Sequence, residues 1–85
     1  SHAALLQLSL AYYRANLNEE SIRAAEEANL LSGGSSANAF NNICAAYNQL
    51  GRYDKAVEAC KSALTFAPDH SLAQANLAYA LSKTR

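Results

Sequence analysis

The chain lacks several features that would place it among nucleic-acid-binding or membrane proteins. Seven basic and seven acidic residues leave a formal net charge of zero at pH 7, so a basic surface for nucleic acid or anionic lipid is missing. No apolar run approaches the roughly 18 residues of a membrane span, and no signal-peptide pattern opens the chain. We therefore expect no nucleic-acid partner and no direct membrane insertion. A soluble domain is predicted, with the cytoplasm slightly favoured.

Cysteine is scarce as well. Cys44 and Cys60 are the only two cysteines, and without a matching pair of histidines they are a poor zinc site. Both lie on the apolar side of the helical pattern, so we expect free buried thiols that behave as small hydrophobic residues. A disulfide or a redox role is the alternative. No metal site and no cofactor are predicted.

Motifs for catalysis are missing too. His2 lies at the start of the chain, and His70 lies beside Asp69 between two predicted helices, where a helix-capping surface is expected. No serine or cysteine has a base at a recognisable spacing. Gly33 and Gly34 lack the lysine and flanking pattern of a phosphate loop. We predict no catalytic residue and no enzyme activity in this chain.

No segment alternates as a β-strand does, whereas helical spacing recurs throughout the chain. The pattern predicts five helices, over residues 3–15, 19–31, 37–50, 54–67 and 71–83. Gly51 is expected to end the third helix, because glycine adopts positive φ without strain, and Pro68 to stop the fourth. The expected N-caps are Asn18 for the second helix, Ser35 or Ser36 for the third, and Asp69 or Ser71 for the fifth.

The segment from Phe40 to Pro68 has the most specific pattern in the chain, an ordered run of large and small residues. It consists of Phe40, Ile43, Cys44, Tyr47, Gly51, Tyr53, Ala56, Cys60, Ala63 and Pro68. Small residues let two helix backbones approach, and bulky ones fill the groove between them. The run resembles the tetratricopeptide repeat, a helix–turn–helix unit of about 34 residues that stacks on copies of itself.

The flanking segments repeat this pattern less faithfully, because the first unit is one residue out of phase and the last is a single helix. In the first unit the matching residues are Leu8, Ser9, Tyr12, Asn16, Ile22, Ala25 and Ala28; in the last they are Leu77, Ala78 and Leu81. The resemblance implies an all-α fold, a short right-handed α-solenoid within one domain spanning 1–85. Residues 2–36 and 37–70 would form two repeats, and 71–85 a capping helix or partial repeat.

The face of the third helix opposite its apolar stripe is rich in carboxamides. Its residues are Asn38, Asn41, Asn42, Ala45, Asn48 and Gln49. Asparagine is a poor helix former, so this concentration indicates another demand on the face. An amide carries donors and an acceptor, which match the N–H and C=O of a peptide backbone. The face is therefore a candidate binding surface for an extended peptide.

The family resemblance places this face in the concave groove. Asn76 follows Asn42 by one unit, and Gln7 holds the corresponding place in the first unit. This arrangement resembles the asparagine ladder with which some tetratricopeptide proteins hold the main chain of a ligand. The alternative, which stays open, is that these amides bond only to neighbouring helices and set their stacking angle.

Equivalent positions in the first and fifth helices complete the predicted groove. They are Leu6, Leu10, Tyr13 and Arg14, together with Leu72, Ala75, Tyr79, Ser82 and Lys83. Tyr79 is the favoured aromatic anchor; Arg14 and Lys83 are either carboxylate contacts or solvated helix ends. Leu6 and Leu10 stand where a lysine and an asparagine would clamp the carboxylate of a chaperone tail, so that subclass is disfavoured.

Three functions remain open at this point. The first is a peptide-binding scaffold that uses the amide face. The second is a structural module that self-associates through its terminal helices, with Leu72, Tyr79 and Leu81 exposed. The third is an accessory segment of a larger enzyme, because the chain resembles bacterial tetratricopeptide segments, some of them attached to glycosyltransferases. The expected partner is a protein or peptide.

Overall fold

Five helices make up the computed structural model, which describes residues 1–84. They are α1 (His2–Arg14), α2 (Asn18–Leu31), α3 (Ala37–Leu50), α4 (Tyr53–Phe66) and α5 (Ser71–Lys83). Each predicted helix is confirmed to within one residue at either end, and no strand occurs in the described residues. None of these helices is long and apolar enough to cross a membrane.

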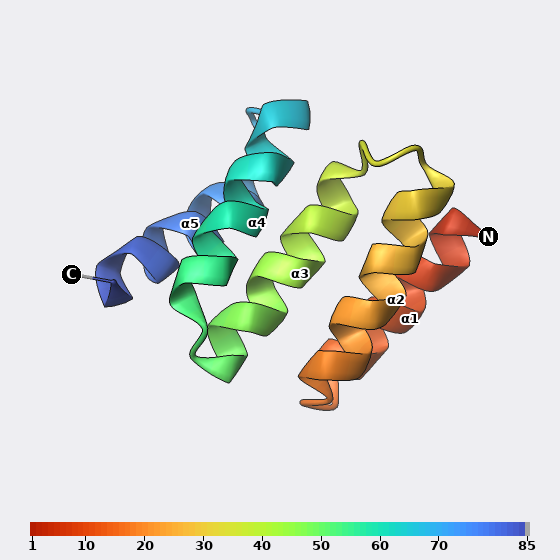
Figure 1. Cartoon of the computed structure of the whole chain (residues 1–85), viewed down its shortest axis with the longest axis horizontal. Helices are drawn as coiled ribbons and strands as arrows, with labels where there is room; N and C mark the ends of the chain where they lie inside the picture. The colour runs from red at the N-terminus through yellow and green to blue at the C-terminus, as the bar shows by residue number, and fades with distance from the viewer. Residues whose placement is uncertain (85) are drawn as a thin grey trace.

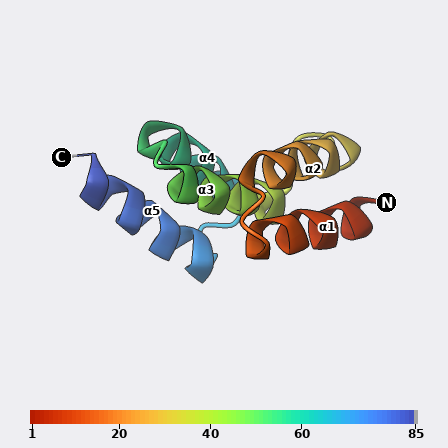
Figure 2. The same ribbon diagram turned by 90° about the horizontal axis from the view of Figure 1, so that it is seen from below.

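The helices stack in chain order along the longest axis of the molecule, with the two termini at opposite ends (Figure 1). Figure 2 shows α2 and α4 on one side and α1 and α5 on the other, with α3 between the pairs. The backbone of α3 lies close to all four other helices, whereas no Cα atoms of α2 and α4, or of α1 and α5, come within 8 Å of each other. This all-helical arrangement of tandem repeats forming a solenoid is the predicted fold.

Small side chains fill the contacts between the helices. The fully buried ones are Ser9, Ser21, Ala25, Ala28, Ala39, Cys44, Ala46, Ala56, Cys60, Ala63, Ala73 and Ala80. Small residues at these positions let the helix backbones come close together, as the alternation of large and small residues predicts. Among the larger apolar side chains, Ile22 and Ile43 are buried with them, whereas Phe40, Tyr47 and Leu50 are only partly buried at the margins of the helix contacts.

The turns within the two helix pairs use the same backbone conformation. Gly51 ends α3 with φ 75°, as predicted. Asn16, its counterpart in the first unit, has φ 63° and is the only described non-glycine residue with positive φ. Asparagine tolerates this left-handed conformation better than most residues. The inexact repeat therefore retains the turn geometry.

Two of the predicted helix caps are wrong. Leu17 occupies the N-cap of α2 without a side-chain bond, while Asn18 is already helical and donates to Asn16 Oδ1 at 3.2 Å. At α5 neither Asp69 nor Ser71 is the cap, because His70 Nδ1 accepts from the backbone N–H of Ala73 at 3.2 Å. The cap of α3 is Ser36, one of the two predicted serines, whose Oγ accepts from the N–H of Ala39 at 3.1 Å.

The prediction of free buried thiols is also wrong. Cys44 of α3 and Cys60 of α4 form a disulfide, with their Cα atoms 5.4 Å apart. Both residues occupy positions where the helices need small side chains, and this brings their backbones within the usual disulfide span. Disulfides persist chiefly in oxidising compartments, so this bond does not support the slight preference for the cytoplasm.

In the first unit, α1 and α2 are joined by a pair of buried serines. Ser9 Oγ donates to the carbonyl oxygen of Ser21 at 2.8 Å, and Ser21 Oγ donates to that of Ser9 at 2.7 Å. The two hydroxyl oxygens are 3.1 Å apart. In the repeat register Ser9 corresponds to Cys44, while Ser21 corresponds to Ala56 and Cys60 to Ala25. The two units therefore join equivalent helices with different chemistry, through the same position on the first helix and different positions on the second.

Candidate functional site

A groove of about 400 Å³ lies on the side of α3 that faces α1 and α5. We name it the concave groove. Its lining residues are Leu6, Gln7, Leu10, Tyr13, Asn38, Asn41, Asn42, Ala45, His70, Leu72 and Asn76. None of them is an aspartate, glutamate, lysine or arginine. The groove therefore combines amides with apolar side chains in a nearly neutral surface.

The structure brings together six of the predicted site residues in this groove: Gln7, Leu10, Asn38, Asn41, Asn42 and Asn76. Three others, Asn48, Gln49 and Tyr79, meet Asn76 in an adjoining hollow of about 180 Å³. Arg14 and Lys83 line neither space. Lys83 instead holds its ammonium group 5.5 Å from the centre of the Tyr79 ring, a separation at which cation–π attraction operates.

Amides link α3 to α5 through two hydrogen bonds. Asn76 Nδ2 donates to Asn41 Oδ1 at 2.9 Å, and Asn48 Nδ2 donates to the backbone carbonyl of Asn76 at 3.1 Å. Asn41 and Asn48 are more than nine-tenths buried. A buried amide without partners is costly, so these bonds help to fix the stacking of the two helices. Asn41, Asn48 and Asn76 thus bond to a neighbouring helix, which is the alternative role considered for these amides.

The contact between α3 and α1 is weaker. Asn42 Nδ2 lies 3.4 Å from Ser9 Oγ, near the limit for a hydrogen bond. Asn42 Oδ1, Asn76 Oδ1 and Asn41 Nδ2 have no hydrogen-bond partner among the described residues, and none of these atoms is buried. Each amide therefore uses one polar atom within the protein and keeps a second one unbonded; those of Asn42 and Asn76, which are only partly buried, are the more accessible, because Asn41 is 7% exposed.

His70 is a groove residue that the sequence interpretation missed. Its Nδ1 accepts from a backbone N–H at the start of α5, so Nε2 carries the ring proton and donates to Asn38 Oδ1 at 2.9 Å. The repeat register could have indicated this position, because His70 follows Ser36, the α3 cap, by one unit of 34 residues. The ring thereby joins the cap of α5 to the groove face of α3.

The described residues hold no group of three histidine, cysteine or acidic side chains placed to bind a metal ion. The two thiols are consumed in the disulfide and do not titrate. The chemistry available at the groove is therefore hydrogen bonding by amides and contact with apolar side chains.

Comparison with known proteins identifies the central unit. The family profile of the tetratricopeptide repeat matches residues 37–70, which contain α3, the Gly51 turn and α4. No curated protein matches the chain. The repeats of this family generally mediate protein–protein interaction and are generally non-catalytic. Residues 37–70 therefore form a tetratricopeptide repeat, and the five stacked helices are consistent with tandem repeats of this kind.

Proposed function

We propose that this domain is a non-catalytic scaffold that holds an extended peptide segment of a partner protein in the concave groove. The main support is the set of accessible amide atoms on Asn41, Asn42 and Asn76. An extended peptide offers main-chain N–H and C=O groups along its length, whatever its side chains. Amide donors and acceptors on α3 and α5 can bond to both kinds of group.

The apolar ends of the groove indicate which side chains such a peptide would carry. Leu6 and Leu10 of α1 line one end and Leu72 of α5 lines the other. Charged side chains would lose hydration against leucine without gaining a partner. The proposed ligand is therefore weakly charged, with apolar side chains on both sides of the segment that contacts the amides.

In this proposal the repeat organisation sets the spacing of the contacts. Residues 2–36 and 37–70 form the two repeats, and the predicted segment 71–85, whose last residue lies outside the described residues, supplies the third groove helix as α5. Gln7, Asn42 and Asn76 are then one equivalent position on three successive helices. Asn48, Gln49 and Tyr79 extend the surface toward the adjoining hollow, while Arg14 and Lys83 lie beyond it as candidate contacts for the ends of a ligand.

The test is selection of binding peptides from a random extended-peptide library, followed by affinity measurement on variants. Asn42→Ala should weaken binding by about twofold to tenfold, because each lost groove hydrogen bond contributes about 0.5 to 1.5 kcal/mol. Asn76→Ala should weaken binding similarly and also lower the melting temperature, because it removes the bond to Asn41. Fluorescence anisotropy and thermal melting separate these two effects.

Gln74→Ala is the matched control, since Gln74 is an exposed amide of α5 that lines neither space and bonds to the carbonyl of Pro68. It should leave peptide affinity unchanged. If Asn42→Ala and Gln74→Ala bind the selected peptides equally well, the amide row is not a ligand site. Loss of folding in Asn42→Ala would likewise assign that amide to stacking.

A second candidate function is self-association through α5. Leu72 is 64% exposed and Tyr79 47%, and their seven-residue spacing places both on one face of α5, so this face presents apolar side chains of the kind that mark an interface. Leu81, 43% exposed, lies on the opposite face. The measurement is mass by light scattering over a wide concentration range, repeated for Tyr79→Ser. A larger species that disappears in Tyr79→Ser would support assembly; a monomer throughout would leave the concave groove free for ligand.

A further inference from the structure

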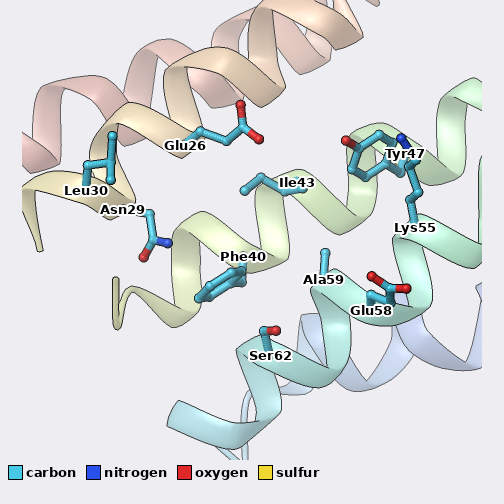
Figure 3. Close-up of a pocket in the computed structure, with 10 residues that line it drawn as sticks. All are labelled: Glu26, Asn29, Leu30, Phe40, Ile43, Tyr47, Lys55, Glu58, Ala59 and Ser62. Atoms are coloured by element: carbon cyan, nitrogen blue, oxygen red, sulfur yellow. The ribbon is translucent and has the colours of Figure 1, made fainter. Parts of the chain in front are cut away.

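A second and larger groove, of about 690 Å³, lies on the opposite side of α3 from the concave groove. We name it the convex groove. Its floor is α3 and its walls are α2 and α4 (Figure 3), two helices whose Cα atoms stay more than 8 Å apart. It uses other residues of α3 than the amide row does, so the two grooves are separate surfaces.

The floor of the convex groove is an apolar stripe. Phe40, Ile43 and Tyr47 project into it from successive turns of α3 (Figure 3). Their positions i, i+3 and i+7 span about 10 Å at 1.5 Å per residue, roughly two helical turns. At one end Phe66 stacks on Phe40 with ring centres 6.1 Å apart, and Leu30 of α2 is 78% exposed.

The walls bring negative charge to this apolar floor from both sides. Glu26 of α2 and Glu58 of α4 line the groove, and neither forms an ion pair within residues 1–84, where the one salt bridge joins Arg52 to Glu19. The single cation of the lining, Lys55, holds its ammonium group 5.7 Å from the centre of the Tyr47 ring. Two unpaired carboxylates therefore flank the stripe.

We propose that the convex groove binds an amphipathic α-helix of a partner protein, with an apolar stripe at i, i+3 or i+4, and i+7 and with basic residues on both sides of that stripe. An apolar trough between two parallel walls is the usual receptor for such a helix. The apolar stripe of the partner would cover Phe40, Ile43 and Tyr47. Its basic residues would meet Glu26 and Glu58.

A second copy of this chain fits the groove less well than a basic helix does. The terminal helices α1 and α5 expose leucines, but each has a single arginine or lysine, placed in its last turn at Arg14 or Lys83. One basic residue at a helix end cannot meet carboxylates on both walls. Charge complementarity therefore favours a different protein as the partner.

The probe for the test is a designed helical peptide with leucines at i, i+3 and i+7 and lysines on both sides of them, labelled with a fluorophore. A matched peptide with glutamates in place of the lysines is the charge control. The lysine peptide should bind more tightly. Adding the lysine peptide should change the chemical shifts of Ile43, Ala59 and their neighbours in α2, α3 and α4 of the protein.

The double variant Glu26→Gln with Glu58→Gln should weaken binding of the lysine peptide about fivefold, since two solvent-exposed ion pairs are lost. Glu27→Gln should have no effect, because Glu27 is an exposed neighbour on α2 that does not line the groove. Asn42→Ala should also have no effect, which separates this proposal from peptide binding in the concave groove.

Three results would overturn the proposal. One is failure of the lysine peptide to bind. Another is equal binding of the lysine and glutamate peptides, unchanged in the glutamine double variant. The third is a dimer of the protein alone, seen by light scattering and lost in Glu58→Arg, which would make a second copy the occupant of the convex groove.

Discussion

The two helix pairs of this molecule meet at equivalent crossings, yet each crossing is joined by a different bond. In the first pair Ser9 and Ser21 exchange hydrogen bonds between α1 and α2. In the second pair Cys44 and Cys60 form a covalent bond between α3 and α4. All four side chains are fully buried. The shared requirement is a small residue, because only small residues let the helices come this close.

Ser9 and Cys44 occupy the same position of the repeat, and comparing them shows that the size of the side chain is constrained there and its chemistry is not. Volume is constrained, because a larger side chain would separate the backbones. Chemistry is not constrained in the same way: a hydroxyl satisfies its hydrogen-bonding capacity on the facing carbonyl, and a thiol can bond to a facing thiol. The resulting links differ in strength and in their sensitivity to reductant.

The largest expected effect comes from removing the covalent link. Replacing both cysteines, as Cys44→Ala with Cys60→Ala, should lower the free energy of unfolding by about 3 kcal/mol, because the disulfide closes a short loop in the unfolded chain. Urea denaturation with and without dithiothreitol measures the loss. The alanine variant should be insensitive to reductant. Equal stability of the oxidised protein and the variant would contradict a stabilising role for the disulfide.

A smaller effect is expected at the serine crossing. Ser9→Ala should lower the free energy of unfolding by about 1 to 2 kcal/mol, because it leaves Ser21 Oγ with only the backbone bond to residue 9 and removes the contact with Asn42. Ser71→Ala, at an exposed position of α5, is the control. A double-mutant cycle with Ser21→Ala measures the coupling. A coupling near zero would mean that the two serines act as independent small residues.

The smallest expected effect is on the pH dependence of stability, and it concerns the residues near the start of α2 and α4. Tyr53 in α4 corresponds to Asn18 in α2, and a side-chain hydrogen bond with Tyr79 raises the pKa of the Tyr53 phenol above its ordinary value. Because the folded-state pKa is the higher one, the stabilisation is complete below about pH 10, the ordinary phenol pKa, and is lost as pH rises through the folded value.

Ultraviolet titration of the phenolate tests this difference. In the folded protein one tyrosine should ionise at higher pH than it does in Tyr79→Phe, where the hydrogen bond is absent. The first repeat offers no counterpart, since Asn18 does not titrate. An unchanged titration curve in Tyr79→Phe would show that the contact between the two tyrosines does not hold the proton on Tyr53.

Much of the fold could be predicted from spacing. The large and small residues from Phe40 to Pro68 define two helices and their turn, and the equivalence of Asn16 to Gly51 anticipates the second positive-φ turn. The disulfide could not be predicted in the same way. The sequence shows that positions 44 and 60 are both apolar and small, but only the relative rotation of α3 and α4 brings their Cα atoms to 5.4 Å.

The candidate site was predictable to a similar extent. Helical periodicity places the amides of α3 on one face, and the repeat step aligns Asn42 with Asn76. Periodicity does not reveal which polar atoms are used within the protein, because those bonds join helices far apart in the chain. The convex groove was not anticipated either. Phe40, Ile43 and Tyr47 have the spacing of core residues, and Ile43 is indeed buried, but the partly buried rings of Phe40 and Tyr47 also line the hollow between α2 and α4.

Helix α3 is the one described helix that contacts every other helix, and this determines how the molecule opens. Helices α1 and α5 can each detach while the remaining helices keep their contacts, so their amide protons exchange with solvent through local fraying. We expect the amide protons of α3 to exchange only when the whole domain unfolds. The protected centre of the protein is therefore the same helix that supplies the amides of one groove and the aromatic rings of the other.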